Sequence, residues 1–111
     1  MFIQDEISAR VKDFIAVCIA HNVRYIFAFG SSTTIGFDIH KSDIDLLVDI
    51  DYSDPVERGE KLISLWDTFE DFFNRKIDLL TETSIHNPYL RKSIDSTKIL
   101  IYDGAKQKVL V

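Results

Sequence analysis

Two short apolar runs, Tyr25–Phe29 and Ile44–Val48, most constrain what this chain can fold into. Apolar runs of this length predict buried strands. A glycine-serine pair directly follows the first run, and an Asp-Ile-Asp sequence leads into the second. We therefore expect a fold that brings these two polar edges together, with the rest of the chain supporting them.

The two acids at the second run have a spacing that suits a metal site. Asp43 and Asp45 are two residues apart, so both project to one face of a strand, whereas Ile44 and Leu46 project to the other. Two carboxylates this close repel each other unless a cation lies between them or one keeps its proton. Carboxylate oxygens suit Mg²⁺. The alternative is that the acids only cap the strand or face water.

The glycine-serine pair suits a phosphate site. Gly30 permits a tight turn and a close approach of the backbone to a ligand. Ser31 and Ser32 can begin a short helix, and the unpaired N–H groups of such an end bind phosphate. The alternative is an ordinary turn with a serine cap.

A third acid lies within another short apolar segment of the sequence. Residues 75–80 predict a short strand that carries Asp78. An acid in a half-buried strand needs a partner. If this strand pairs beside the second run, Asp78 faces the other two acids, and three carboxylates can hold two Mg²⁺ ions for phosphoryl displacement. The alternative is a salt bridge from Asp78 to Arg75 or Lys76.

Together these pieces resemble the minimal nucleotidyltransferases of the DNA polymerase beta superfamily. The signature of that family is an apolar strand, Gly-Ser, a spacer, Asp-x-Asp opening a strand, and a later strand with a third acid. Here it reads FGS, a spacer of eleven residues, DIDLLV and KIDLL. The resemblance covers most of the chain.

The resemblance implies a role for each residue of the signature. It implies that the nucleotide phosphates are held by Gly30, Ser31 and Ser32. It implies that the metals and the catalysis depend on Asp43, Asp45 and Asp78. The third of these acids, Asp78, is then either a metal ligand or the base for the attacking hydroxyl.

The spacer departs from the family pattern. The family commonly has one or two arginines after Gly-Ser, whereas this chain has Ser32 and Thr33. Hydroxyls replace the bidentate grip of a guanidinium only in part. Within the spacer, His40 or Lys41 can supply a donor or be solvated, and Phe37 can stack on a base or anchor the loop.

Composition limits the classes of function. The 13 basic and 18 acidic residues give a net charge of −5, which argues against a general nucleic-acid binder. The single cysteine, Cys18, predicts a buried thiol in a cytoplasmic protein. No apolar run approaches the length of a membrane span, so we expect no membrane association. The 111 residues predict a single domain, 1–111.

The order of the predicted elements indicates an α+β fold. Helices are predicted over residues 3–20 and 55–74, and a short one around Pro88, with a final strand over residues 98–102. The acids at Asp49, Asp51 and Asp54 are expected to be solvated and to add to the negative field around the metals. The expected architecture, including what the resemblance implies, is a small mixed sheet with helices mainly on one face: a polymerase-beta-like nucleotidyltransferase fold.

The resemblance also implies a function. Stand-alone minimal members of the family resemble the antitoxins of two-gene modules whose toxin is a HEPN-type ribonuclease. The implied reaction is Mg²⁺-dependent transfer of AMP from ATP to a tyrosine of that toxin, in a hetero-oligomer. The alternative is a module of weak or no activity that neutralises its partner by masking it. The missing arginine favours the second reading, and the three acids favour the first.

Overall fold

A mixed five-stranded sheet forms the centre of the fold. The computed structural model describes residues 2–33 and 43–110. The sheet has the order β3-β2-β1-β4-β5. Its strands are β1 (Val23–Ala28), β2 (Ile44–Ile50), β3 (Ile77–Leu80), β4 (Ile99–Asp103) and β5 (Lys108–Val109). β2 and β3 are parallel, whereas the other neighbouring strands are antiparallel. The predicted α+β fold with a small mixed sheet is confirmed.

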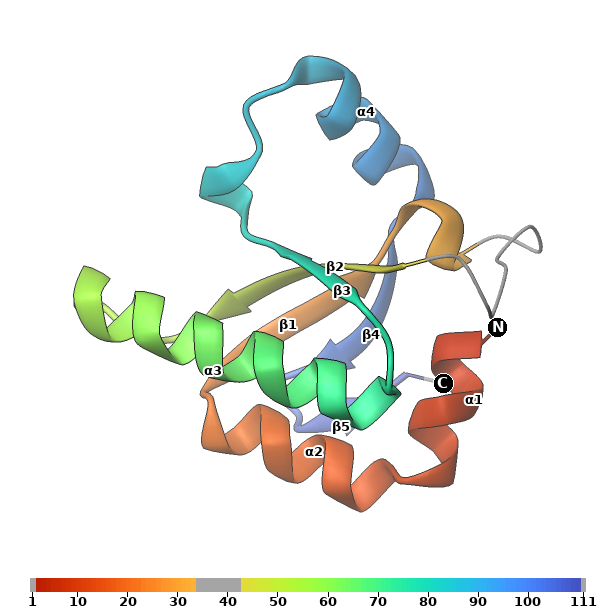
Figure 1. Cartoon of the computed structure of the whole chain (residues 1–111), viewed down its shortest axis with the longest axis vertical. Coiled ribbons are helices and arrows are strands. Elements are labelled where there is room, and N and C mark those ends of the chain that lie inside the picture. The colour runs from red at the N-terminus through yellow and green to blue at the C-terminus, as the bar shows by residue number, and fades with distance from the viewer. Residues whose placement is uncertain (1, 34–42, 111) are drawn as a thin grey trace.

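Four α-helices surround this sheet. They are α1 (Phe2–Ala9), α2 (Val11–Ala20), α3 (Pro55–Phe73) and α4 (Pro88–Thr97), with two 3₁₀ turns, η1 (Gly30–Thr33) and η2 (Glu82–Ser84). α1, α2 and α3 lie on one face of the sheet, and α4 lies on the other (Figure 1). The helices are therefore mainly on one face, as predicted. No helix within the described ranges is long and apolar enough to cross a membrane.

The single helix predicted over residues 3–20 is wrong. The helix is interrupted at Arg10, whose backbone angles of φ −143° and ψ 49° are not helical. The Arg10 side chain donates a hydrogen bond to the Phe72 carbonyl, and its guanidinium lies 3.9 Å from the centre of the Phe72 ring. The break lets α1 and α2 bury Ile7 and Phe14 from different directions. The apolar spacing continues across the break, which is why it predicts one helix.

The ends of α3 and α4 follow local rules. The Asp54 carboxylate accepts a hydrogen bond from the Glu57 N–H at 3.1 Å, and Pro55 occupies the first turn of α3. α3 ends at Asn74, which adopts the left-handed conformation with φ 50°. Asn87 caps α4 directly before Pro88. The predicted position of α3 is confirmed within one residue.

The main core lies between the sheet and α1, α2 and α3. One face of β2 is fully apolar and buried, and the aromatic face of α3 packs against it. Phe14 stacks on Phe69 with ring centres 5.5 Å apart. The aromatic face of α3 joins the core through four buried residues, Leu65, Phe69, Phe72 and Phe73. Ile63 on the same helix is 64% exposed.

Side chains of α3 also occupy the outer edge of β3. The Trp66 indole N–H donates to the Ile77 carbonyl at 2.7 Å. The Ile77 N–H donates to the Glu70 carboxylate at 3.1 Å. Both backbone polar groups of Ile77 are therefore bonded to side chains of the covering helix.

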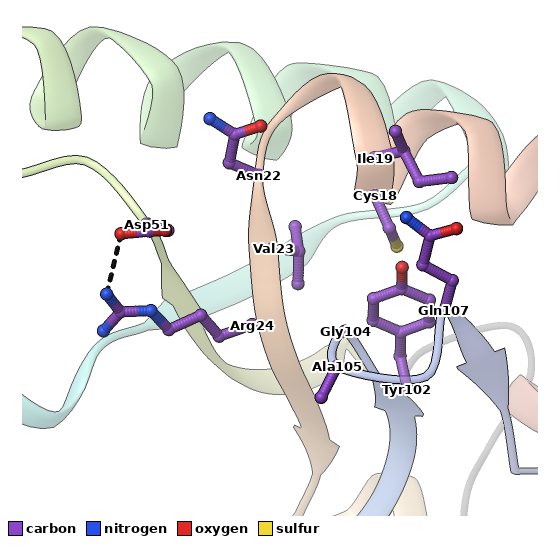
Figure 2. Close-up of a pocket in the computed structure, with 10 residues that line it drawn as sticks. All are labelled: Cys18, Ile19, Asn22, Val23, Arg24, Asp51, Tyr102, Gly104, Ala105 and Gln107. Atoms are coloured by element: carbon purple, nitrogen blue, oxygen red, sulfur yellow. Dashed lines mark hydrogen bonds and ion pairs between the residues drawn. The ribbon is translucent and has the colours of Figure 1, made fainter.

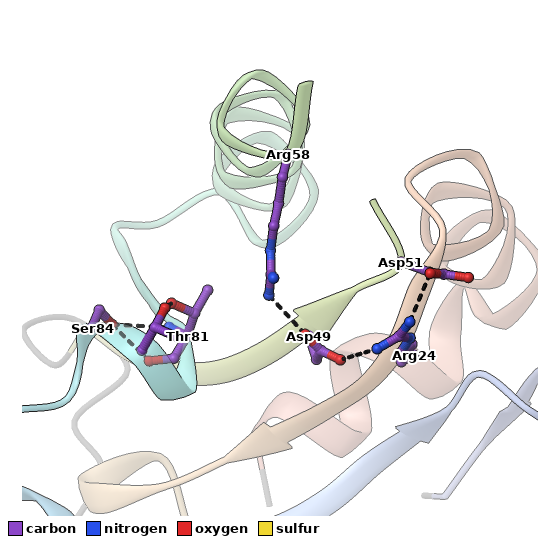
Figure 3. A network of polar contacts seen from close by, with 7 residues as sticks. Arg24, Asp49, Asp51, Arg58, Thr81 and Ser84 are labelled. Carbon is purple, nitrogen blue, oxygen red and sulfur yellow. Dashed lines mark hydrogen bonds and ion pairs between the residues drawn. The ribbon is translucent and has the colours of Figure 1, made fainter. Parts of the chain in front are cut away.

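Two arginines bind the acids that follow the metal-site candidates along β2 (Figure 3). Arg58 of α3 contacts Asp49 at 2.8 Å, and Arg24 of β1 contacts both Asp49 at 3.2 Å and Asp51 at 2.7 Å. The expectation that Asp49 is solvated is wrong, because its side chain is only 20% exposed and is paired twice. Asp54 is a helix cap. These acids therefore have local partners.

A second, smaller apolar cluster lies on the opposite face of the sheet. Ile94 of α4 packs with Phe29 and Leu47, and all three side chains are buried. This cluster fixes the C-terminal part of α4 over the ends of β1 and β2. The face of the sheet that carries the acids is therefore covered only at this end.

Candidate active site

The three predicted acids lie at one end of the sheet, on neighbouring parallel strands. Asp43 directly precedes β2, and Asp45 is the second residue of that strand. Asp78 is the second residue of β3 and lies in register with Asp45. Since residues next to Asp45 bury their side chains in the main core, Asp45 and Asp78 project to the opposite face. The structure thus brings together two acids that are 33 positions apart in sequence.

The carboxyl groups of Asp45 and Asp78 interact directly. The pKa of Asp45 is raised to about 6, first by burial, then by the negative charge of Asp78, a hydrogen bond with Asp78 and the charge of Asp43. Two adjacent carboxylates cannot both carry a full charge at low cost unless a proton or a cation lies between them. The geometry thus concentrates negative charge at this end of the sheet.

Asp43 has a basic neighbour. Its Oδ2 atom lies 3.8 Å from the Lys76 ammonium, and the Lys76 side chain is 70% exposed. Of the alternative partners considered for Asp78, Lys76 contacts Asp43, and the Arg75 guanidinium lies over the Phe2 ring at 4.6 Å.

The donor set fits a hard divalent cation in its chemistry. Among residues 2–33 and 43–110, no three His, Cys, Asp or Glu side chains converge closely enough to hold a metal ion. The three acids nevertheless offer only carboxylate oxygens, the ligands that Mg²⁺ prefers. Burial first, and then the neighbouring carboxyl groups of Asp78 and Asp43, raise the pKa of Asp45. A dication at this place would relieve the repulsion.

Gly30 is required where it stands, directly beside the acids. Its φ is +62°, and a Cβ there would lie 3.0 Å from Oδ2 of Asp45. Its N–H donates to the Thr97 hydroxyl at 2.9 Å. The glycine therefore allows the turn to approach Asp45, while its own amide is already bonded within the protein.

The two serines of the turn differ in exposure. Ser31 is exposed. Ser32 is 1% exposed, and its hydroxyl accepts a hydrogen bond from the Asp45 N–H at 2.8 Å. The helix expected to begin here is the short 3₁₀ turn η1, in which the Thr33 hydroxyl donates to the Gly30 carbonyl at 2.9 Å. Ser32 thus positions the backbone of Asp45.

Sequence reasoning missed Thr97. It lies 67 residues from Gly30, at the end of α4, and no local pattern marks it as part of this site. The spacer residues considered as phosphate or base contacts, Phe37, His40 and Lys41, lie outside the described residues.

A separate cavity lies at the opposite end of β1 (Figure 2). Its volume is about 540 Å³, and its walls include Cys18, Arg24 and Tyr102. Cys18 is fully buried, and burial raises the pKa of its thiol. The predicted buried thiol is confirmed. The cavity contains none of the three candidate metal ligands, so it does not belong to this site.

Known proteins share this sequence pattern. The family described as "Polymerase beta, Nucleotidyltransferase" matches residues 12–107. A Methanocaldococcus jannaschii protein named "Putative protein adenylyltransferase" is 42% identical over 81 residues, covering 73% of this chain and 79% of that protein. A second protein of the same name and organism is 48% identical over 60 residues, covering 54% and 58% of the two chains.

Solved structures share the fold. A structure described as a "putative minimal nucleotidyltransferase" superposes with a TM-score of 0.59 at 23% identity, covering 86% of this chain and 93% of that one. A toxin-antitoxin structure with AMP-PNP gives 0.56 at 19% identity, covering 88% and 83%. A Shewanella oneidensis complex of a tri-AMPylated HEPN toxin with its MNT antitoxin gives 0.50 at 18% identity, covering 96% and 76%.

The chain therefore belongs to the polymerase beta nucleotidyltransferase family. The predicted family resemblance is confirmed. The prediction that the chain is an enzyme of the nucleotidyltransferase class is confirmed as well.

Proposed function

We propose that this chain, acting as a single domain over residues 1–111, transfers AMP from ATP to a tyrosine of a HEPN-type toxin and thereby acts as an antitoxin. The observation that carries the proposal is the meeting of Asp45 and Asp78 beside Gly30, at one end of the sheet. Acids that only stabilised the fold would not be expected to face each other, because like charges at this distance cost stability.

The nucleotide site is assigned to the turn after β1 and to the acids. Gly30 leaves room beside Asp45, and Ser31 is an exposed residue of the same turn. Asp43, Asp45 and Asp78 would hold Mg²⁺, with two ions expected. Bound there, Mg²⁺ would neutralise phosphate charge and lower the pKa of the attacking hydroxyl.

The reaction is a nucleotidyl transfer. The oxygen of the acceptor hydroxyl forms a bond to the α-phosphorus of ATP, and the bond from that phosphorus to the β-phosphate oxygen breaks. Pyrophosphate leaves with this electron pair. The proton of the acceptor hydroxyl is lost to a base, a role that Asp78 fills if it is not a metal ligand.

The partner is supported by the relatives. Sequence relatives carry the name of protein adenylyltransferases, and a structure with the same fold is an antitoxin bound to an AMPylated HEPN toxin. The acceptor is therefore expected to be a protein and the working form a hetero-oligomer. No direct binding of nucleic acid and a cytoplasmic location remain part of the proposal.

The test is the intact mass of a candidate HEPN partner after incubation with this chain, ATP and Mg²⁺. We expect a mass increase of one AMP or a multiple of it, located on tyrosine by peptide mapping. The double variant Asp43→Ala, Asp45→Ala should give no increase. Asp51→Asn is the matched control, because Asp51 directly follows β2 and binds Arg24 at the end of that strand far from the three acids.

Each result decides between the two functions. Loss of the increase in both variants would point to damage of the fold rather than to the site. A stable complex with no mass increase, even for the unmodified chain, would contradict the transferase proposal and support a module that masks its partner.

A further inference from the structure

The turn that carries Gly30 is held by α4, an element far from it in sequence. Thr97 is the last residue of α4, and its hydroxyl accepts the hydrogen bond of the Gly30 N–H at 2.9 Å. The same hydroxyl donates its proton to the Ser93 carbonyl at 2.7 Å. Since a hydroxyl has only one proton, this second bond leaves a lone pair directed at Gly30.

An apolar contact reinforces this hold. Ile94 lies three residues before Thr97, on the same side of the helix, and packs against Phe29. α4 therefore contacts two consecutive residues of the turn: Phe29 through a buried side chain and Gly30 through its amide.

The turn also holds the backbone of Asp45. The Phe29 N–H donates to the Asp45 carbonyl at 3.1 Å, and the Asp45 N–H donates to the Ser32 hydroxyl at 2.8 Å. Both backbone polar groups of Asp45 are thus bonded to residues of the turn. A shift of the turn would therefore move the acid that faces Asp78.

From this chain of contacts we propose that Thr97 is a positioning residue of the nucleotide site, acting through Gly30 on the turn and on Asp45. The proposal rests on the proposed function, because it assumes that nucleotide binds beside this turn. In this role Thr97 acts through the backbone of Gly30 rather than by contact with phosphate or acceptor. Its hydroxyl fixes the Gly30 amide and leaves the glycine's open side facing Asp45.

The decisive variant is Thr97→Val, which keeps the shape of the side chain and removes the hydroxyl. It leaves the Gly30 N–H without its acceptor. An unsatisfied donor at this partly buried position costs enough to weaken a dependent equilibrium up to about tenfold. We expect ATP to bind about tenfold more weakly in the presence of Mg²⁺, measured by calorimetric titration of the isolated chain. Thr97→Ser restores the hydroxyl and should bind ATP as the unmodified chain does.

Thr68→Val is the matched control. The Thr68 hydroxyl donates to the Ser64 carbonyl at 2.7 Å, the same bond to the preceding turn of a helix that Thr97 makes to Ser93. Thr68 lies on α3, across the sheet from Gly30. Loss of the Thr68 hydroxyl should leave ATP binding unchanged.

Hydrogen exchange separates positioning from general destabilisation. The Gly30 amide should exchange faster in Thr97→Val than in Thr97→Ser or Thr68→Val, while amides of the main core keep their rates. If Thr97→Val does not fold, Thr97→Ala provides the same test of the hydroxyl.

The outcomes differ for the two proposals. Equal ATP binding by the unmodified chain and the hydroxyl-free variants would overturn the role of Thr97 and leave the proposed function standing. Equal weakening by Thr68→Val would overturn it as well. Failure of the unmodified chain to bind ATP at all would overturn the proposed function and, with it, this inference.

Discussion

The ionised Asp45 carboxylate lowers the stability of the folded protein, because it is half-buried beside two other acids. Its pKa of about 6 in the folded chain lies above its ordinary value of 3.8, so the folded state binds the proton more tightly than the unfolded state does. The resulting stability is fully present below the ordinary pKa and is lost as pH rises through about 6. Without divalent cations, the free energy of unfolding should therefore fall between pH 4 and pH 7 from this group.

The isosteric variant Asp45→Asn removes this charge. At pH 7.5 without divalent cations, it should be more stable than the unmodified chain by about 1 kcal/mol, a modest gain because solvent screens a half-buried carboxyl. Urea unfolding at pH 4.5 and pH 7.5 measures the difference, which should shrink at the lower pH. A variant that is less stable at pH 7.5 would contradict the electrostatic account. The same substitution should abolish nucleotidyl transfer.

Gly30 and Gly59 make a matched pair for a second prediction. Gly30→Ala places a Cβ at φ +62° and 3.0 Å from Asp45, so it should cost about 1–2 kcal/mol of stability and lower ATP affinity. Gly59→Ala lies within α3 with no atom within 4 Å of its Cβ, so it should stabilise the fold by about 0.5–1 kcal/mol. Thermal melts and ATP titration check both. Similar effects from the two substitutions would show that the left-handed turn is not the cause.

At this scale, the sequence predicts side-chain direction better than bonding partners. The alternation of residues along a strand is enough to place Asp45 opposite the core face, and a parallel neighbour brings Asp78 to it. The bonds of Ser32 and Thr97 depend on how η1 and α4 meet, and no sequence pattern specifies that meeting. The resemblance implies a phosphate contact for Ser32, and the sequence alone does not indicate that its hydroxyl accepts a hydrogen bond from the Asp45 N–H.

Among the elements, the break between α1 and α2 depends on one side chain. Arg10→Ala removes the hydrogen bond to the Phe72 carbonyl and the contact with the Phe72 ring. We expect a loss of about 1–2 kcal/mol in the free energy of unfolding, measured by urea titration. Lys12→Ala, an exposed change two residues away, should alter it by less than about 0.5 kcal/mol. A loss no larger than that of Lys12→Ala would indicate that apolar packing alone sets the break.

The same comparison explains which elements could be predicted. α3 and α4 begin at Asp54-Pro55 and Asn87-Pro88, where capping groups lie beside the residues that they cap. Such local chemistry is visible in the sequence. The break at Arg10 depends on Phe72, which is 62 residues away, so apolar spacing alone favours one continuous helix.

In the whole molecule, stability and chemistry occupy different parts of the sheet. The main core lies on the face covered by α1, α2 and α3. The arginine–aspartate contacts lie toward the distal end of β2. The acids and the glycine turn lie at the other end, where only α4 covers the sheet. The class of fold could be predicted because its signature combines several pieces. The separation of the core from the acids on the sheet could not be predicted, because it depends on which strands become neighbours.

The bonds that Trp66 and Glu70 make to Ile77 bear on how this protein can assemble. A bare edge strand is a template for another strand, either in β-augmentation by a partner or in aggregation. At the β3 edge, the carbonyl and the N–H of Ile77 are already taken by side chains of α3. An incoming strand would have to displace both bonds. We therefore expect partners to meet this protein through side chains rather than by extending its sheet at β3.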